Sequence, residues 1–236
     1  MTTLLEIRDL RLQYGQFKAL HGLDVEIAEG EIVAVIGANG AGKSSLIKGI
    51  CCTEGQTSGS VKLDGRELLG LTPPQIARAG IGLVPEGRRI FPSLSVEENI
   101  LLGGQLGQDH GGTPWTLERI YELFPDLTAK RHLSGTMLSG GQQQMIAIGR
   151  ALMTNPRVLL CDEISLGLAP TIINRLYEQL IALASEGLAV LVVEQAMRKA
   201  LEISDRYYCI LEGRVSLSGI SADADEDRIA QAYFGR

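Results

Sequence analysis

The sequence predicts an α/β fold with a parallel sheet at its centre. Apolar runs at Glu31–Ile36, Val158–Cys161 and Leu188–Val193 are typical of strands that are buried on both faces. A glycine-rich string, GANGAGKS, follows the first run and leads into the helix-compatible stretch Ser44–Ile50. A strand, a glycine-rich loop and a helix in this order place a helix N-terminus at the ligand-binding edge of the sheet.

Further strands are expected on both sides of this central set. The segments Leu4–Leu12 and Leu23–Ala28 alternate enough to form an antiparallel edge sheet. Val61–Leu63 joins that sheet and ends in an Asp64-Gly65 turn. Two more core strands are predicted at Ile81–Val84 and Arg206–Leu211.

The stretch between Arg88 and Met153 has mainly helical patterning. Its glycine-dense part, Gly103–Pro114, predicts a mobile surface loop. Pro170 is well placed to open the next helix, because proline is favoured at the first helical position. After the acidic stretch Ser221–Asp227, a short helix is predicted at Ile229–Phe234.

The string GANGAGKS fits the pattern GxxxxGKS, in which successive backbone N–H groups curl around a phosphate. Lys43 adds a mobile positive charge, and the Ser44 hydroxyl can hold a magnesium ion. The residues expected to contact a nucleotide here are Gly37, Ala38, Asn39, Gly40, Ala41, Gly42, Lys43, Ser44 and Ser45.

A second string, VLLCDE, places two carboxylates at the C-terminal end of an apolar strand. Neighbouring residues of an extended segment face opposite ways, so Asp162 and Glu163 can take different roles. We expect Asp162 to accept hydrogen bonds from groups around magnesium and Glu163 to polarise an attacking water as a general base.

The third string, LSGGQQQ, predicts a helix that starts at Gly140 or Gly141. Ser139 and Gln142 have the spacing of a capping box. Two glycines leave the first-turn amides bare, so this helix end can bind a phosphate group. An ordinary capped surface helix is the alternative that the capping box alone supports.

Composition narrows the class of protein. The hydrophobic fraction of 45% and charged fraction of 21% suit one large globular domain, and the net charge of −6 argues against binding to nucleic acid. No apolar stretch approaches the roughly 20 residues that a membrane span needs. Charged residues near the N-terminus predict that there is no signal peptide, and four cysteines without CxxC spacing indicate reduced, cytosolic thiols.

In this order and spacing, the three strings resemble those of the ATP-binding subunits of ABC transporters, over essentially all 236 residues. The resemblance implies a P-loop NTPase fold with an ABC-type antiparallel β subdomain and a helical subdomain, forming a single ATPase domain over 1–236. The nucleotide-binding core and β subdomain are expected at 1–86 and 156–236. The helical signature subdomain is expected at 87–155.

The resemblance also implies cofactors and partners. ATP and Mg²⁺ are the expected cofactors, with each ATP held between the phosphate loop of one domain and the LSGGQ helix of another. Because the chain has a single GxxxxGKS, a second ATPase subunit, identical or different, is expected to complete each site. Two transmembrane permease subunits and, indirectly, an external solute-binding protein are implied. The expected location is peripheral, on the cytoplasmic face of the inner (plasma) membrane, with the isolated subunit soluble.

Further roles follow from the resemblance alone. Tyr14 stands where the family places an aromatic ring on adenine, although a tyrosine at a strand end is unremarkable. Ser165–Pro170 resembles the loop that touches the partner domain, or is a plain strand-to-helix turn. Arg88, Arg89 and Phe91 either relay γ-phosphate binding to the permeases or form a solvated basic pair beside a core phenylalanine.

Three positions depart from the general family pattern. Glu86 replaces the usual sensor glutamine; it can ligate magnesium but, when ionised, cannot donate a hydrogen bond. Gln195 replaces the usual switch histidine; it can donate to a γ-phosphate but cannot become a cation. Ile164 replaces a proline, which changes loop rigidity. The implied site comprises Lys43, Glu163 and Gln195 for catalysis, Ser44, Glu86 and Asp162 for magnesium, and Ser139, Gly140, Gly141 and Gln142 of the partner on the γ-phosphate.

Four segments resemble one branch of the family, the ATPases of branched-chain (hydrophobic) amino-acid importers with their urea and amide relatives. They are PEGRRIFPSLSVEEN, VEQ at Val193–Gln195, SLGLAP, and AYFG at Ala232–Gly235. Urea or short-chain amide import remains an alternative. So does a non-transport ABC ATPase, although these usually carry two ATP domains or a long coiled-coil insertion. A small-molecule kinase would have no use for LSGGQ.

Overall fold

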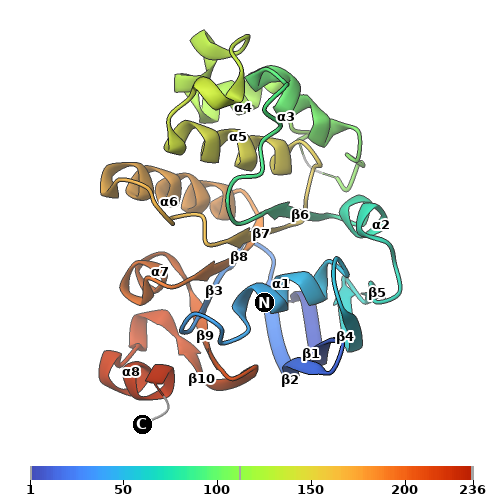
Figure 1. Ribbon diagram of the computed structural model, residues 1–236, viewed down its shortest axis with the longest axis vertical. Helices are drawn as coiled ribbons and strands as arrows, with labels where there is room; N and C mark the ends of the chain where they lie inside the picture. Colours follow the sequence, from blue (N-terminus) through green and yellow to red (C-terminus); the bar gives the residue numbers. More distant parts are fainter. Residues whose placement is uncertain (1, 112, 235–236) are drawn as a thin grey trace.

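The computed structural model describes residues 2–111 and 113–234. Two sheets organise the chain (Figure 1). The smaller is antiparallel, with the order β2-β1-β4-β5. Its strands are β1 (Thr3–Tyr14), β2 (Phe17–Ala28), β4 (Gln56–Leu63) and β5 (Arg66–Glu67).

The antiparallel strands are longer than predicted. β1 and β2 continue past the predicted ends to a tight turn at Gly15 and Gln16. Register shifts interrupt their pairing, and Asp9, at one of them, has a φ of 45°. Such irregularities break the strict alternation by which a strand is recognised, which is why the sequence indicated shorter segments.

The larger sheet has the order β10-β9-β3-β8-β7-β6, and all its neighbouring pairs except β10-β9 are parallel. The predicted core strands are confirmed within a residue at each end. The edge strand β10 was not predicted, because its residues are half-buried or exposed. The strands are β3 (Ile32–Ile36), β6 (Ile81–Val84), β7 (Val158–Asp162), β8 (Ala189–Glu194), β9 (Arg206–Leu211) and β10 (Arg214–Ile220).

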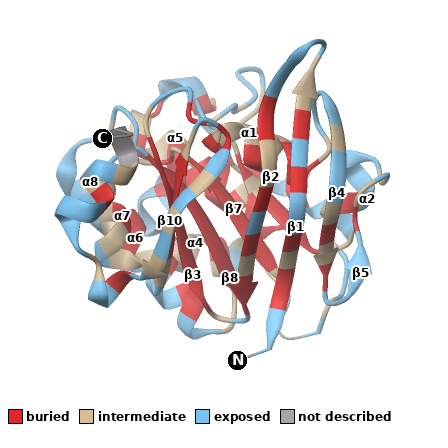
Figure 2. Cartoon of the chain, turned by 90° about the horizontal axis from the view of Figure 1, so that it is seen from below, coloured by how far each residue is buried: buried red, intermediate tan, exposed pale blue. Residues whose placement is uncertain are grey.

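Helix α1 (Lys43–Ile50) lies between the two sheets (Figure 1). Its side chains Leu46, Ile47 and Ile50 belong to one buried cluster with residues of β1, β2, β3 and β8. Figure 2 shows the buried residues concentrated along the strands of both sheets. The phosphate loop is therefore fixed between a rigid strand and a helix that is buried on several sides.

A helical arm covers the far end of the molecule (Figure 1). A second buried cluster joins its side chains, among them Ile100, Ile120 and Phe124, to Leu159 and Val190 of the central sheet. The proposed division between residues 87–155 and the rest of the chain stays a prediction. The arm contains α3 (Val96–Gly104), α4 (Leu117–Leu123), 3-10 turns at Pro125–Lys130 and Gly135–Met137, and α5 (Gly140–Leu152).

The remaining helices flank the central sheet. Pro170 is the first residue of α6, as predicted. The predicted loop Gly103–Pro114 begins inside α3, and its Gly112 lies outside the described residues, as does Gly235 of the AYFG string. Within the described residues, no helix combines the length and apolar character that a membrane span needs. These helices are α2 (Pro73–Arg78), α6 (Pro170–Ser185), α7 (Met197–Ile203) and α8 (Glu226–Phe234).

Candidate nucleotide site

The phosphate loop connects β3 to α1 and depends on glycine at two positions. A Cβ atom on Gly37 would lie 2.4 Å from the Ile210 carbonyl oxygen. Gly42 precedes the first helical residue with a φ of 111°, in the left-handed region. A side chain at either position would push the loop out of place, so the sequence pattern reflects packing as well as phosphate binding.

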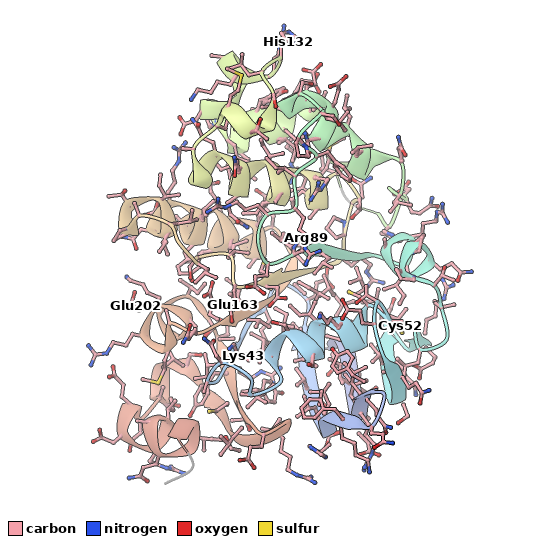
Figure 3. The ribbon with its side chains drawn as sticks, viewed as in Figure 1. Lys43, Cys52, Arg89, His132, Glu163 and Glu202 are labelled. Carbon is pink, nitrogen blue, oxygen red and sulfur yellow. The ribbon has the colours of Figure 1, made fainter. Side chains whose placement is uncertain are left out.

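Lys43 is folded back over this loop. Only 3% of its side chain is exposed, and its Nζ lies 3.3 Å from Oε1 of Glu163. The ammonium also donates to the backbone oxygens of Gly37 at 2.9 Å and Ala38 at 3.3 Å. Figure 3 shows Lys43 and Glu163 near each other, where α1 begins and β7 ends.

Ser44 and Asp162 are in contact, as a shared metal ligand set requires. The Ser44 hydroxyl donates to Oδ1 of Asp162 at 3.0 Å. Burial raises the pKa of Asp162 to about 6; the Ser44 hydrogen bond opposes that rise, and the carboxylates of Glu86 and Glu163 add to it. A carboxyl group this poorly solvated gains strongly from a cation beside it.

The candidate magnesium ligands suit an ion that is also bound by phosphate. The candidate ligands Ser44, Asp162 and Glu86 all offer oxygen atoms, which Mg²⁺ prefers. No group of three or more acidic, histidine or cysteine side chains forms a metal cage within the described chain. Mg²⁺ commonly binds to one or two protein groups plus substrate phosphates, so this donor set suits an ion that arrives with a nucleotide.

Glu163 adopts an unusual backbone conformation. Its φ is 47°, a left-handed value that is uncommon for residues other than glycine. Its N–H donates to the Val193 carbonyl oxygen at 2.9 Å, which holds the residue at the end of β7. Gln195 is exposed and comes directly after β8, so both predicted catalytic side chains reach the same edge of the sheet.

Half of the predicted site residues line one cavity of about 470 Å³. Gly37, Ala38, Ala41 and Asp162 are not among its lining residues. A larger cavity of about 580 Å³, beside Trp115, contains none of the predicted residues. The lining of the 470 Å³ cavity is Phe17, Ala19, Asn39, Gly40, Gly42, Lys43, Ser44, Ser45, Glu86, Glu163, Leu166 and Gln195.

The aromatic residue in this lining is Phe17, not Tyr14. Phe17 is 68% exposed, at the start of β2. Tyr14 is half-buried against the core, and its hydroxyl lies 3.5 Å from Ser45 Oγ. Sequence reasoning missed Phe17 because its position depends on the turn between β1 and β2. An aromatic residue directly after a turn was the signal that could have found it.

The LSGGQ string forms the predicted cap. Helix α5 begins at Gly140, with Ser139 as its N-cap. The Ser139 hydroxyl accepts from the Gln142 N–H at 3.4 Å, and the Gln142 side chain accepts from the Ser139 N–H at 3.2 Å. These residues, together with Gly141, lie in the helical arm and line no part of their own chain's 470 Å³ cavity.

Arg88 lies against this helix end. A Cβ atom on Gly140 would come within 2.8 Å of the Arg88 guanidinium, which also donates to the Gln143 side chain at 3.3 Å. Phe91 is 49% exposed, so the alternative of a core phenylalanine at this position is wrong. The segment that follows Glu86 therefore contacts the N-terminal end of α5, called the signature helix below. It also exposes the aromatic ring of Phe91 at the surface.

Comparison with known proteins identifies the family. A model described as "ABC transporter" matches residues 20–165. The chain belongs to the ABC transporter family. It is accordingly a nucleotide-binding ATPase of the kind that powers transport.

This ABC family member aligns with three known proteins over at least 92% of its length. It is 44% identical, over 94% of its own length and 95% of the relative's, to the high-affinity branched-chain amino acid transport ATP-binding protein BraG of Pseudomonas aeruginosa. The ADP conformation of MJ1267, an ATP-binding cassette, matches with a TM-score of 0.83 and 25% identity over all of both chains. A dimeric, post-hydrolysis structure of the cassette MJ0796 with ADP and Pi matches with a TM-score of 0.79 and 25% identity. The match covers 92% of this chain and 99% of the MJ0796 chain.

Proposed function

We propose that this chain is the ATPase subunit of an importer for branched-chain or other hydrophobic amino acids. The observation that carries the proposal is the 44% identity to BraG over 94% of the chain. Import of urea or a short-chain amide is the second candidate, because the VEQ and SLGLAP segments resemble those of both groups. The subunit contacts nucleotide and partner proteins, so its own cavity does not select the solute.

In the proposed reaction, the γ-phosphoryl group of ATP is transferred to water in the cavity beside α1. Lys43 and the loop amides bind the β- and γ-phosphates. Ser44 and Asp162, with Glu86 close by, would hold Mg²⁺, which supplies charge neutralisation at the phosphate oxygens when bound. Glu163 orients the attacking water and accepts its proton. Gln195 donates a hydrogen bond to the γ-phosphate.

A second ATPase subunit completes the site in this proposal. The signature residues Ser139 to Gln142 are well formed but lie outside the lining of their own chain's 470 Å³ cavity. A head-to-tail pair would bring the signature helix of one chain to the phosphate loop of the other. The dimeric state of MJ0796, in a structure that also holds ADP and Pi, supports this arrangement.

Two permeases and an external solute-binding protein complete the proposed machine. Its ATPases would sit peripherally on the cytoplasmic face of the membrane. The exposed ring of Phe91, on the segment that joins Glu86 to the helical arm, supports permease docking at this place.

Uptake by cells tests the proposed solute class. Cells from which the coding sequence of this chain has been deleted are expected to lose uptake of labelled leucine, isoleucine and valine, and to regain it with the parent chain but not with Glu163→Gln. Labelled urea and acetamide are the comparison solutes. Loss of urea or amide uptake alone would favour the second candidate, and unchanged uptake of all of them would refute both.

A further inference from the structure

A buried carboxylate outside the predicted site holds the loop that follows Glu163. Glu194 is the last residue of β8 and is 2% exposed. Its carboxylate accepts two hydrogen bonds from one residue, from the Ser165 N–H at 3.1 Å and from the Ser165 hydroxyl at 2.7 Å. A residue of the central sheet is thus bound to the loop after Glu163 by two hydrogen bonds.

The surroundings of Glu194 make these hydrogen bonds costly to lose. Burial raises its pKa, and the Ser165 hydroxyl, the Tyr177 hydroxyl and the Ser165 N–H oppose that rise. None of the described basic side chains forms an ion pair with it. The Tyr177 hydroxyl is also buried beside this carboxylate. A buried acidic group with few partners is strongly tied to the donors it has.

Glu163 sits between two anchors that both come from the end of β8. Its own N–H is bound to the Val193 carbonyl oxygen at 2.9 Å, and two residues later Ser165 is bound to Glu194. Between these anchors the chain makes the left-handed turn at Glu163, with φ of 47°. A non-glycine residue persists in this conformation only where its surroundings fix it.

We propose that Glu194 is a positioning residue that, through Ser165, fixes the Glu163 carboxylate and the loop Ser165–Ala169 in the arrangement needed for hydrolysis. The proposal rests on the proposed role of Glu163 as general base. Gln195 comes directly after Glu194 at the end of β8. In this proposal Glu194 therefore sets the spacing between Glu163, which activates water, and Gln195, which donates to the γ-phosphate.

The test measures ATP hydrolysis in the complex purified with the subunits that accompany this chain. Ser165→Ala and Glu194→Ala are each expected to lower kcat by about tenfold to about 100-fold, because a misplaced catalytic group loses rate without losing substrate binding. The KM for ATP and the Kd for a fluorescent ATP analogue are expected to change by less than about threefold. The double variant is expected to lose little more than either single one, because both remove the same link.

Glu194→Gln separates the role of the hydrogen bonds to Ser165 from the role of the negative charge on Glu194. The glutamine oxygen can accept from the Ser165 N–H while its amide donates to the Ser165 hydroxyl oxygen. This variant is therefore expected to have a kcat several-fold higher than Glu194→Ala. Glu194→Met fills a similar volume without the acceptor oxygens and is expected to stay near the rate of Glu194→Ala. Recovery in Glu194→Gln alone therefore separates the hydrogen bonds to Ser165 from space filling.

Glu67, an exposed residue, supplies a control with the same two kinds of hydrogen-bond donor. It too accepts from a serine hydroxyl, that of Ser60 at 2.5 Å, and from a backbone N–H, that of Val61 at 2.8 Å, but it lies in the antiparallel sheet. Glu67→Ala and Ser60→Ala are expected to leave kcat at the parent value. If they lower kcat as much as the Glu194 and Ser165 variants do, the effect is general destabilisation and the proposal fails.

Other outcomes also decide. Unchanged kcat in Ser165→Ala, or equal losses of kcat and nucleotide affinity, would overturn the positioning role. If Glu194→Ala does not fold, Ser165→Ala carries the test, since it removes a single hydroxyl group. A parent-like rate in Glu163→Gln would instead refute the general base itself, which separates failure of the proposed function from failure of this inference.

Discussion

The Lys43 ammonium lies 3.3 Å from the Glu163 carboxylate, in a pair with little exposure on either side. The proposed phosphate-binding cation and the proposed general base are therefore neighbours. A γ-phosphate that binds Lys43 would compete with this ion pair and release the carboxylate toward an attacking water. The contact suggests how nucleotide binding and activation of the base are joined.

Glu163→Gln should separate binding from turnover. The amide keeps the shape of the side chain but cannot accept the proton, so kcat in the assembled complex is expected to fall by about 100-fold or more. The Kd for ATP should stay within a few-fold of the parent value. Phosphate-release and nucleotide-binding assays measure the two quantities, and a parent-like kcat would contradict the assigned role.

Lys43→Ala should have the opposite signature. Removal of the ammonium takes away charge-assisted hydrogen bonds to phosphate and leaves the Glu163 carboxylate without its partner, so ATP affinity is expected to fall by about tenfold to about 100-fold. Equilibrium titration with a fluorescent ATP analogue measures this loss. An unchanged Kd would mean that the loop amides alone bind the phosphates.

Phe17→Ala tests which aromatic side chain meets the base of the nucleotide. Phe17 lines the cavity and Tyr14 does not. Loss of a stacking ring is expected to weaken ATP affinity by about twofold to about tenfold. The matched variant Tyr14→Phe removes only the hydroxyl near Ser45 and is expected to keep the parent affinity. A Phe17→Ala variant with parent affinity, beside a weakened Tyr14→Ala, would return the role to Tyr14.

Asp162→Asn should stabilise the fold while stopping hydrolysis. The pKa of Asp162 is raised to about 6 from an ordinary 3.8, so the folded state binds the extra proton between these values and the parent loses stability as pH rises through that window. Above it, the asparagine variant is expected to exceed the parent by up to about 2 to 3 kcal/mol in free energy of unfolding.

Denaturant unfolding in EDTA without nucleotide, at pH 5 and pH 8, measures this difference. The gap between Asp162→Asn and the parent should be larger at pH 8 than at pH 5. Groups elsewhere in the chain titrate in both proteins and cancel in the comparison. A gap that is equal at both values would contradict the burial of an ionisable Asp162.

Gly140→Ala tests the signature helix. The new Cβ atom would lie 2.8 Å from the Arg88 guanidinium and would also cover the first-turn amides. Hydrolysis in the complex is expected to fall by about tenfold or more, since hydrogen-bond donors to the transition state are displaced, while ATP binding to the isolated chain is unchanged. Gly104→Ala is the control, because its Cβ atom would meet only Met153 at an ordinary 3.5 Å.

The parts of the site that sequence predicted are those with local causes. Ser139 and Gln142 cap a helix through residues three apart, and Asp162 ends an apolar strand; both arrangements are visible as spacing. Phe17 depends on the length of two irregular strands, which spacing does not reveal. The Glu194 contact with Ser165 joins residues 29 apart and becomes evident only when β7 and β8 lie side by side.

The same distinction applies to the fold. Buried parallel strands such as β3 and β7 were predicted because a short, unbroken apolar run is typical of a strand covered on both faces. The edge strand β10 has no such run. Its signal was the turn at Glu212 and Gly213, both with positive φ, which joins it to β9 in a tight hairpin.

Ser139 does not line the cavity beside the phosphate loop of its own chain, and this bears on how much ATP a cell hydrolyses. A lone copy holds half of the proposed hydrolysis site. Newly made or surplus copies without a partner subunit would therefore not hydrolyse ATP. Hydrolysis would then begin only after the complex has assembled.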